Sequence, residues 1–173
     1  MLPPELRNSI YSYVLVSNQY TRIDQVTWNN HQPSLLRTCR TMRREGIKIF
    51  YTMNDFMIAL GPFDGSVAHR FHGLMDALGL VKEDNRFIKV EGAPNWPNLL
   101  IWLKRFHEEG GPCLGQPPLG RRTVADNTVE MEQKIVGAAF HIVARCADMR
   151  WDFVKELLET QHVILEQLDS RWA

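Results

Sequence analysis

Residues 35–56 read LLRTCRTMRREGIKIFYTMNDF and carry the clearest periodic pattern of the chain. At the 100° per residue of an α-helix, apolar residues gather on one side and basic residues on the other. The apolar side holds Leu35, Cys39, Met42, Gly46, Ile49 and Phe50, and the basic side holds Arg37, Arg40, Arg44 and Lys48. The pattern predicts one amphipathic helix over 35–51 with a basic stripe.

The first residues of the chain predict a second amphipathic helix, over 4–15. Pro3 and Pro4 suit the first turn of a helix, and Glu5 there complements the helix dipole. One face of this helix is apolar and holds Leu6, Ile10, Tyr13 and Val14. We expect the helix to pack through that single stripe.

Three short segments favour β-strands. Residues 20–28 are rich in Thr, Ile, Val and aromatic side chains, and 55–60 and 86–91 also have strand character. A helix over 66–78 separates the last two strands, so they can pair in parallel through a crossover. Antiparallel pairing with 20–28 is equally allowed.

The second half of the chain is predicted to be helical. A helix over 98–109 ends at two glycines, and Gly and Pro residues then interrupt the chain. Two long amphipathic helices follow, from about 127 to 146 and from 151 to 170, and they favour an antiparallel hairpin. We therefore predict an α+β fold: a small sheet of about three strands, packed helices and a C-terminal two-helix hairpin. Its parts are an α+β domain over 1–110, a linker over 111–123, and a hairpin over 124–173 on the same core.

Charge is balanced overall but not along the chain. The chain has twenty Lys and Arg residues and twenty Asp and Glu residues, which argues against a tail or domain that binds nucleic acid by bulk charge. Residues 1–60 hold seven basic and four acidic side chains, and residues 124–173 hold five and nine. The two ends are electrostatically complementary.

Two segments together resemble a known group of proteins. Residues 2–15 (LPPELRNSIYSYVL) and 35–56 are similar to fungal F-box-like proteins with paired Glu and Arg motifs. The matching residues are Pro4, Glu5, Leu6, Arg7, Ile10, Tyr11, Leu36, Cys39, Arg40, Arg43, Glu45, Phe50, Tyr51, Asn54 and Phe56. All of them lie in the first third of the chain, and their order is more specific than any single motif.

The resemblance implies a non-catalytic protein–protein interaction module, and an adaptor role in a ubiquitin ligase. F-box domains recruit the Skp1 adaptor through the apolar face of their short helices. If this carries over, the adaptor contacts here are Leu2, Pro3, Leu6, Ile10, Val14 and Leu15. The basic stripe of 35–51 suits an acidic protein surface, and nucleic-acid binding through it is the alternative.

The sequence offers no catalytic signature, and an enzyme of unknown type is the third reading. No GxGxxG, P-loop, HExxH or nucleophile elbow occurs. His69, His72 and Asp76 share a helical face, which we expect to point to solvent, and their spacing does not favour a metal site. We expect no catalytic residue, metal or cofactor.

Cysteine use and hydropathy bear on location. The three cysteines are far apart and form no CxxC pair, which favours a reducing compartment, the cytosol or nucleus. No stretch approaches the ~18 consecutive apolar residues of a membrane span, so we expect none. The apolar faces of the last two helices leave a homodimer open.

Overall fold

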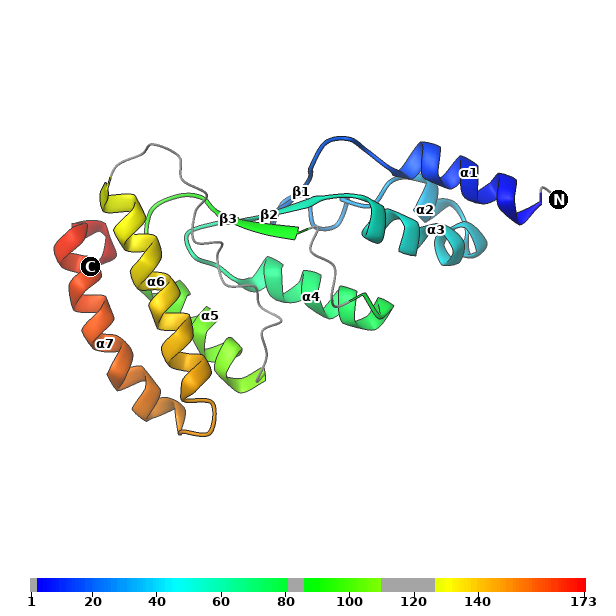
Figure 1. Ribbon diagram of the computed structural model, residues 1–173. Helices are drawn as coiled ribbons and strands as arrows, with labels where there is room; N and C mark the ends of the chain where they lie inside the picture. Colours follow the sequence, from blue (N-terminus) through cyan, green and yellow to red (C-terminus); the bar gives the residue numbers. More distant parts are fainter. Residues whose placement is uncertain (1–2, 81–85, 110–126) are drawn as a thin grey trace.

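The computed structural model describes residues 3–80, 86–109 and 127–173 (Figure 1). The elements in chain order are α1 (Pro4–Leu15), β1 (Thr21–Ile23), α2 (Leu35–Thr38), α3 (Arg40–Met53), β2 (Phe56–Leu60), α4 (Ser66–Leu78), β3 (Arg86–Val90), α5 (Trp96–Glu109), α6 (Asn127–Arg145), α7 (Trp151–Leu168) and the 3-10 turn η2 (Ser170–Trp172). The predicted α+β class is confirmed, including the three-stranded sheet and the C-terminal hairpin. The predicted linker over 111–123 lies outside the described residues.

The three strands form one parallel sheet in the order β1-β2-β3. Phe56 at the start of β2 is in register with Thr21 of β1 and Arg86 of β3. Of the two pairings open from the sequence, the structure has the parallel one, with α4 in the crossover between β2 and β3. Helices α1–α3 lie at one end of the sheet and α5–α7 at the other (Figure 1).

β1 is shorter than the strand predicted over 20–28. Asp24 ends it, because its carboxylate accepts hydrogen bonds from the backbone N–H groups of Val26 and Thr27 at 3.0 and 2.8 Å. The backbone N–H of Trp28 also bonds to the Asp24 carbonyl at 2.9 Å. These bonds turn residues 24–28 away from the sheet, as Asp side chains commonly do.

The single helix predicted over 35–51 is wrong, because the chain breaks at Cys39. Cys39 has extended backbone angles, φ −150° and ψ 164°, and separates α2 from α3. The break shifts the helical phase, so Cys39 and Met42 are exposed rather than buried. The buried side instead holds Leu36, Gly46, Phe50 and Tyr51.

The buried side chains of both ends belong to one continuous hydrophobic core. Near α3 it is aromatic: the ring centroid of Phe56 lies 5.5, 5.4 and 5.4 Å from those of Phe50, Tyr51 and Phe71. Towards the hairpin, the Trp102 ring of α5 meets Phe140 of α6 at 4.9 Å. The hairpin therefore extends the core of the sheet.

The joint between α4 and α5 depends on a glycine. A Cβ atom at Gly65, just before α4, would lie 2.4 Å from the indole ring of Trp102. Trp102 is fully buried, so its ring has little room to move. Gly73, in the middle of α4, has no such neighbour within 4 Å.

We therefore expect Gly65→Ala to lower the free energy of unfolding by about 1–3 kcal/mol through overpacking. Gly73→Ala is the matched control and should raise it by about 0.5–1 kcal/mol, because alanine favours the helix. Urea unfolding followed by tryptophan fluorescence measures both. Equal stability of the two variants would contradict the close contact at Trp102.

Candidate protein-interaction site

Helix α1 packs against α3 over a glycine. Tyr11 and Leu15 are the buried residues of α1. A Cβ atom at Gly46 of α3 would lie 2.9 Å from the Leu15 side chain and 3.0 Å from that of Leu36. The missing side chain at position 46 therefore lets both leucines approach the α3 backbone closely.

A polar network fixes the rotation of α1 about its own axis. Arg7 of α1 donates two hydrogen bonds to the Glu45 carboxylate of α3, from Nε at 3.0 Å and from Nη2 at 3.1 Å. The Tyr11 hydroxyl donates a third to Glu45 at 2.9 Å. The hydrogen bond from Arg7, then that from Tyr11, lowers the pKa of Glu45. A bidentate pair of arginine and carboxylate fixes the relative orientation of the two helices and also stabilises their contact.

Asn54 joins the C-terminal ends of α1 and α3. Its Nδ2 donates to the carbonyls of Leu15 and Phe50, each at 2.8 Å, and its Oδ1 accepts from the Ser17 backbone N–H at 2.7 Å. The residue is only 1% exposed. Helix ends leave carbonyl groups without partners, and Asn54 satisfies one on each helix.

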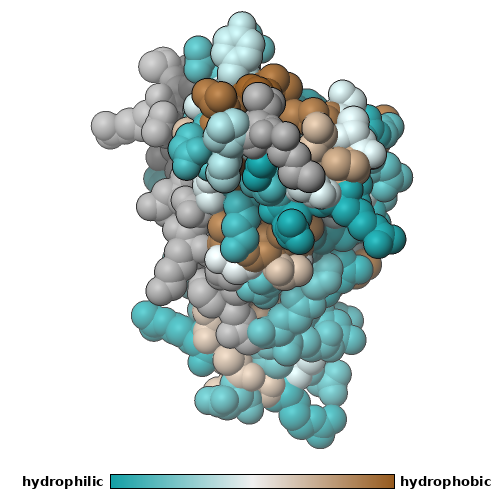
Figure 2. Space-filling model, turned by 90° about the vertical axis from the view of Figure 1, so that its right-hand side faces the viewer, coloured by the Kyte–Doolittle hydropathy of each residue, from teal (hydrophilic) through white to brown (hydrophobic). Residues whose placement is uncertain are grey.

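These contacts turn the apolar stripe of α1 outward. Leu6, Ile10 and Val14 are 53%, 45% and 52% exposed, and Tyr13 is 91% exposed. The expectation that α1 packs through this stripe is wrong, because the opposite side, with Tyr11 and Leu15, faces α3. In Figure 2, brown apolar side chains gather near the top of the molecule, where α1 lies.

The structure groups three of the six residues named as adaptor contacts. Leu6, Ile10 and Val14 follow one another at four-residue spacing along the exposed stripe. Pro3 is exposed just before it, whereas Leu15 is buried against Gly46 and does not share the stripe. Leu2 lies outside the described residues.

The basic stripe is exposed but divided between two helices. Arg40, Arg44 and Lys48 lie on α3 at four-residue spacing, and none makes an ion pair in the described part of the chain. Arg37 lies on α2 and donates to the Asn30 side chain at 3.0 Å. Glu45 bonds to Arg7 of α1, and the charge of Arg44 in the stripe also contributes to lowering the pKa of Glu45.

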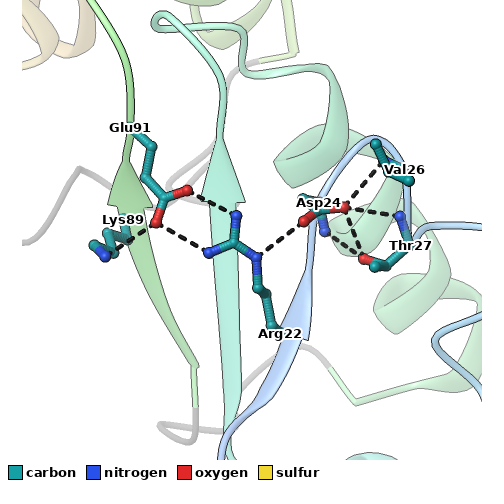
Figure 3. Close-up of polar contacts among 6 residues, drawn as sticks. All are labelled: Arg22, Asp24, Val26, Thr27, Lys89 and Glu91. Carbon is teal, nitrogen blue, oxygen red and sulfur yellow. Dashed lines mark hydrogen bonds and ion pairs between the residues drawn. The ribbon is translucent and has the colours of Figure 1, made fainter.

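A second charged cluster, not expected from the sequence, staples the sheet (Figure 3). Arg22 of β1 reaches across β2 and donates two hydrogen bonds to Glu91, at 3.0 and 2.7 Å, and one to Asp24 at 2.9 Å. Lys89 also pairs with Glu91 at 3.0 Å. Hydrogen bonds from Arg22 and then Lys89 lower the pKa of Glu91 to about 2. Arg22 and Glu91 are 69 residues apart, so no local pattern predicts this pairing.

The cluster of His69, His72 and Asp76 on α4, which we predicted to face solvent, does so only in part. Nδ1 of His69 lies 3.2 Å from a Glu109 oxygen at the end of α5, and Asp76 is exposed. His72 is partly buried, and desolvation, followed by the charge of Arg86, lowers its pKa to about 4. In the described residues, no three or more His, Cys, Asp or Glu side chains are grouped to hold a metal ion.

A pocket of about 470 Å³ lies beside the C-terminal end of α1. Its lining includes Val14, His31 and Arg37. Nδ1 of His31 lies 2.5 Å from the Trp28 carbonyl oxygen, and its Nε2 lies 2.6 Å from the Tyr51 hydroxyl oxygen. Burial lowers the pKa of His31 and raises that of Tyr51 to about 12. These groups hold the loop before α2 in place.

Comparison with known proteins adds no relative. No family model, curated protein or solved structure matches this chain. The F-box-like resemblance therefore stays a prediction that depends on the motif residues. Within the described residues, no helix is both long enough and apolar enough to span a bilayer.

Removing the Asn54 side chain tests the joint between α1 and α3. Asn54→Ala leaves the Leu15 carbonyl, the Phe50 carbonyl and the Ser17 N–H without this partner. We expect it to lower the free energy of unfolding by about 2–4 kcal/mol. Asn98→Ala, which removes one exposed bond to the Pro62 carbonyl, should cost under about 1 kcal/mol. If urea denaturation shows that the two variants lose equal free energies of unfolding, the three bonds of Asn54, which we call the Asn54 clamp, do not have this role.

His72 predicts a pH dependence of stability. The unfolded side chain titrates near 6.5 and the folded one near 4, so the unfolded state binds the extra proton between these values. The free energy of unfolding should therefore fall as pH drops from 6.5 towards 4. His72→Gln should make this fall shallower, as measured by urea unfolding at several pH values. If the free energy of unfolding changes equally with pH in the two proteins, His72 is not the source of the pH dependence, whatever the absolute stabilities.

Proposed function

We propose that this chain is a non-catalytic protein–protein interaction module that binds its partner through the exposed stripe of α1. The observation that carries the proposal is that Leu6, Ile10 and Val14 stay exposed on a helix whose other side is fixed. An apolar side chain gains about 1.5–3 kcal/mol on full burial. Residues at i, i+4 and i+8 form the ridge by which helices enter apolar grooves.

The motif residues support an F-box-like module. Arg7, Tyr11 and Glu45 form the polar network, and Asn54 forms the clamp. Four of the residues that carry the resemblance thus hold α1 with its apolar stripe outward. We infer that the partner is a Skp1-type adaptor and that the chain serves a ubiquitin ligase.

Two further features fit a binding role. The Arg22 and His31 clusters bond internally and hold strands and loops in place, which favours a non-catalytic module. Cys39 and Cys146 are free thiols, and Cys39 is exposed. Free exposed thiols suit a reducing compartment, so we propose the cytosol or nucleus.

Nucleic-acid binding through 35–51 is the second candidate function. It is favoured by the exposure of Arg40, Arg44 and Lys48, which are spaced one helical turn apart. Three cations on a chain of zero net charge give weak attraction to a polyanion. An acidic protein surface is therefore the partner that we favour for this stripe.

Ile10→Lys tests the docking stripe. Ile10 is exposed, so the variant should fold, but a charge in an apolar groove should weaken binding to a Skp1-type adaptor at least about tenfold. Ser9→Lys places the same charge on the neighbouring polar face and should bind as the parent does. Titration calorimetry with purified adaptor measures both.

Absence of binding by the parent at micromolar adaptor would remove the adaptor proposal. Equal weakening by the two variants would show that α1 binds without using its apolar stripe.

A further inference from the structure

We propose that the pocket at the C-terminal end of α1 binds a carboxylate of the protein segment that docks along the apolar stripe of that helix, with Arg37 as its main contact. The inference rests on the proposed binding role of α1 and adds the chemistry of the partner, which is an acidic side chain next to apolar ones. The lining of the pocket carries it, because a residue of the stripe and an exposed cation meet there.

The pocket continues the apolar stripe of α1. Leu6, Ile10 and Val14 span about 12 Å along the helix axis at 1.5 Å per residue. Val14, the last of them, is exposed and also lines the pocket. Arg37 of α2 lines the same pocket. A segment that lies along the stripe therefore meets Arg37 where the stripe ends.

Bonds within the chain hold the walls of the pocket in place. Its buried lining residues are Leu15, Phe50 and Asn54, and the Asn54 clamp bonds to the carbonyls of the other two. On the loop before α2, Nε2 of His31 lies 2.6 Å from the Tyr51 hydroxyl oxygen. The volume of about 470 Å³ is in the range of ordinary, largely preformed binding sites. The pocket therefore has room for side chains of a partner without a rearrangement of its walls.

Arg37 gives the pocket a positive charge that its described lining does not neutralise. The described residues that line the pocket include no Asp or Glu. Arg37 is exposed, bonds to the neutral Asn30 side chain at 3.0 Å and makes no ion pair in the described part of the chain. Burial lowers the pKa of His31, so its ring is uncharged at neutral pH. The pocket therefore suits one negative charge.

The hydrogen-bonding groups around Arg37 that remain free are donors. A guanidinium has five N–H donors in a planar fork, and Nη1 of Arg37 uses one on the Asn30 oxygen. This bond leaves the Asn30 amide N–H groups for another acceptor. The exposed Ser34 hydroxyl makes no capping bond to α2 and can also donate. A carboxylate only accepts hydrogen bonds, and its two oxygens match the arginine fork.

The single cation favours a carboxylate over a phosphate. A phosphate group carries a charge of about −1.5 to −2 at neutral pH, which one arginine does not balance. A carboxylate carries one negative charge, as the side chains of Asp and Glu do. We therefore assign the pocket to an acidic side chain of the partner rather than to a phosphorylated one.

The stripe and the pocket have separate roles in binding. Burial of the apolar stripe supplies most of the affinity. An ion pair at the exposed end of the contact adds little affinity, but it discriminates among partners through charge complementarity. Arg37 thus distinguishes an apolar segment that carries an acidic side chain at this place from one that does not.

Titration of the full chain with two blocked dipeptides tests the pocket without an adaptor. Acetyl-Leu-Glu-amide carries an apolar side chain and a carboxylate, and acetyl-Leu-Gln-amide has the same shape without the charge. At concentrations up to the order of 10 mM, the first should cause saturable NMR shifts of the Arg37 Hε and the Asn30 side-chain amide, and the second should not. Arg37→Gln should remove the response of Asn30. Arg70→Gln, the same change at an exposed arginine of α4, should keep it.

Three results of this titration would overturn the inference. They are the absence of a saturable response to the glutamate dipeptide, an equal response to the glutamine dipeptide, and equal shifts at Arg40 and Arg44. The last result would indicate diffuse attraction to the basic stripe. Circular dichroism should show that both variants are folded.

Titration calorimetry with a purified Skp1-type adaptor tests whether the partner uses the pocket. Arg37→Gln should weaken binding about three- to tenfold, and Arg70→Gln should bind as the parent does. Equal binding by the parent and Arg37→Gln would overturn this inference and leave the proposed role of the α1 stripe intact. If the parent does not bind the adaptor, the adaptor proposal fails, and the dipeptide titration still decides whether the pocket binds a carboxylate.

Discussion

The clamp made by Asn54 is the constraint on which the rest of the N-terminal end depends. One buried amide binds a carbonyl of α1, a carbonyl of α3 and a backbone N–H beyond α1. A buried amide that loses its partners is costly, so the two helices must end at the same place. The two helix ends are joined there, and the Arg7–Glu45 pair sets the rotation of α1 about its axis. Tyr11 and Leu15 therefore face α3, and the apolar stripe of α1 stays exposed.

The charged cluster around Arg22 on the sheet and the basic residues of α3 have different roles. Arg22, Asp24, Lys89 and Glu91 neutralise one another across the sheet, so they stabilise the strands and leave no cation for a partner. Arg40, Arg44 and Lys48 have no such partners in the described part of the chain. The exposed cations therefore lie on α3, on a different side of that helix from Gly46 and Glu45, which contact α1.

Local pattern predicted much of the secondary structure. α1 and α4 have the predicted bounds, since Pro3, Pro4 and Gly65 punctuate the chain at their starts. The break at Cys39 has no such punctuation, and α3 begins after it with the hydrogen bond from the Arg43 N–H to the Cys39 carbonyl. The outward face of α1 was equally hidden, because a helical wheel shows which residues share a side but not which side meets the core. The Arg22 cluster joins residues far apart in sequence, so no spacing indicates it.

The sequence by itself determined the class of fold and the positions of most helices and strands. These follow from periodicity and turn chemistry, which act over a few residues. Only the tertiary structure decided that the sheet is parallel, that Tyr11 rather than Ile10 is buried, and that the acidic and basic helices lie at opposite ends of the molecule. Those outcomes depend on contacts between distant segments, whose free energy is shared among many side chains and is not encoded in any one stretch.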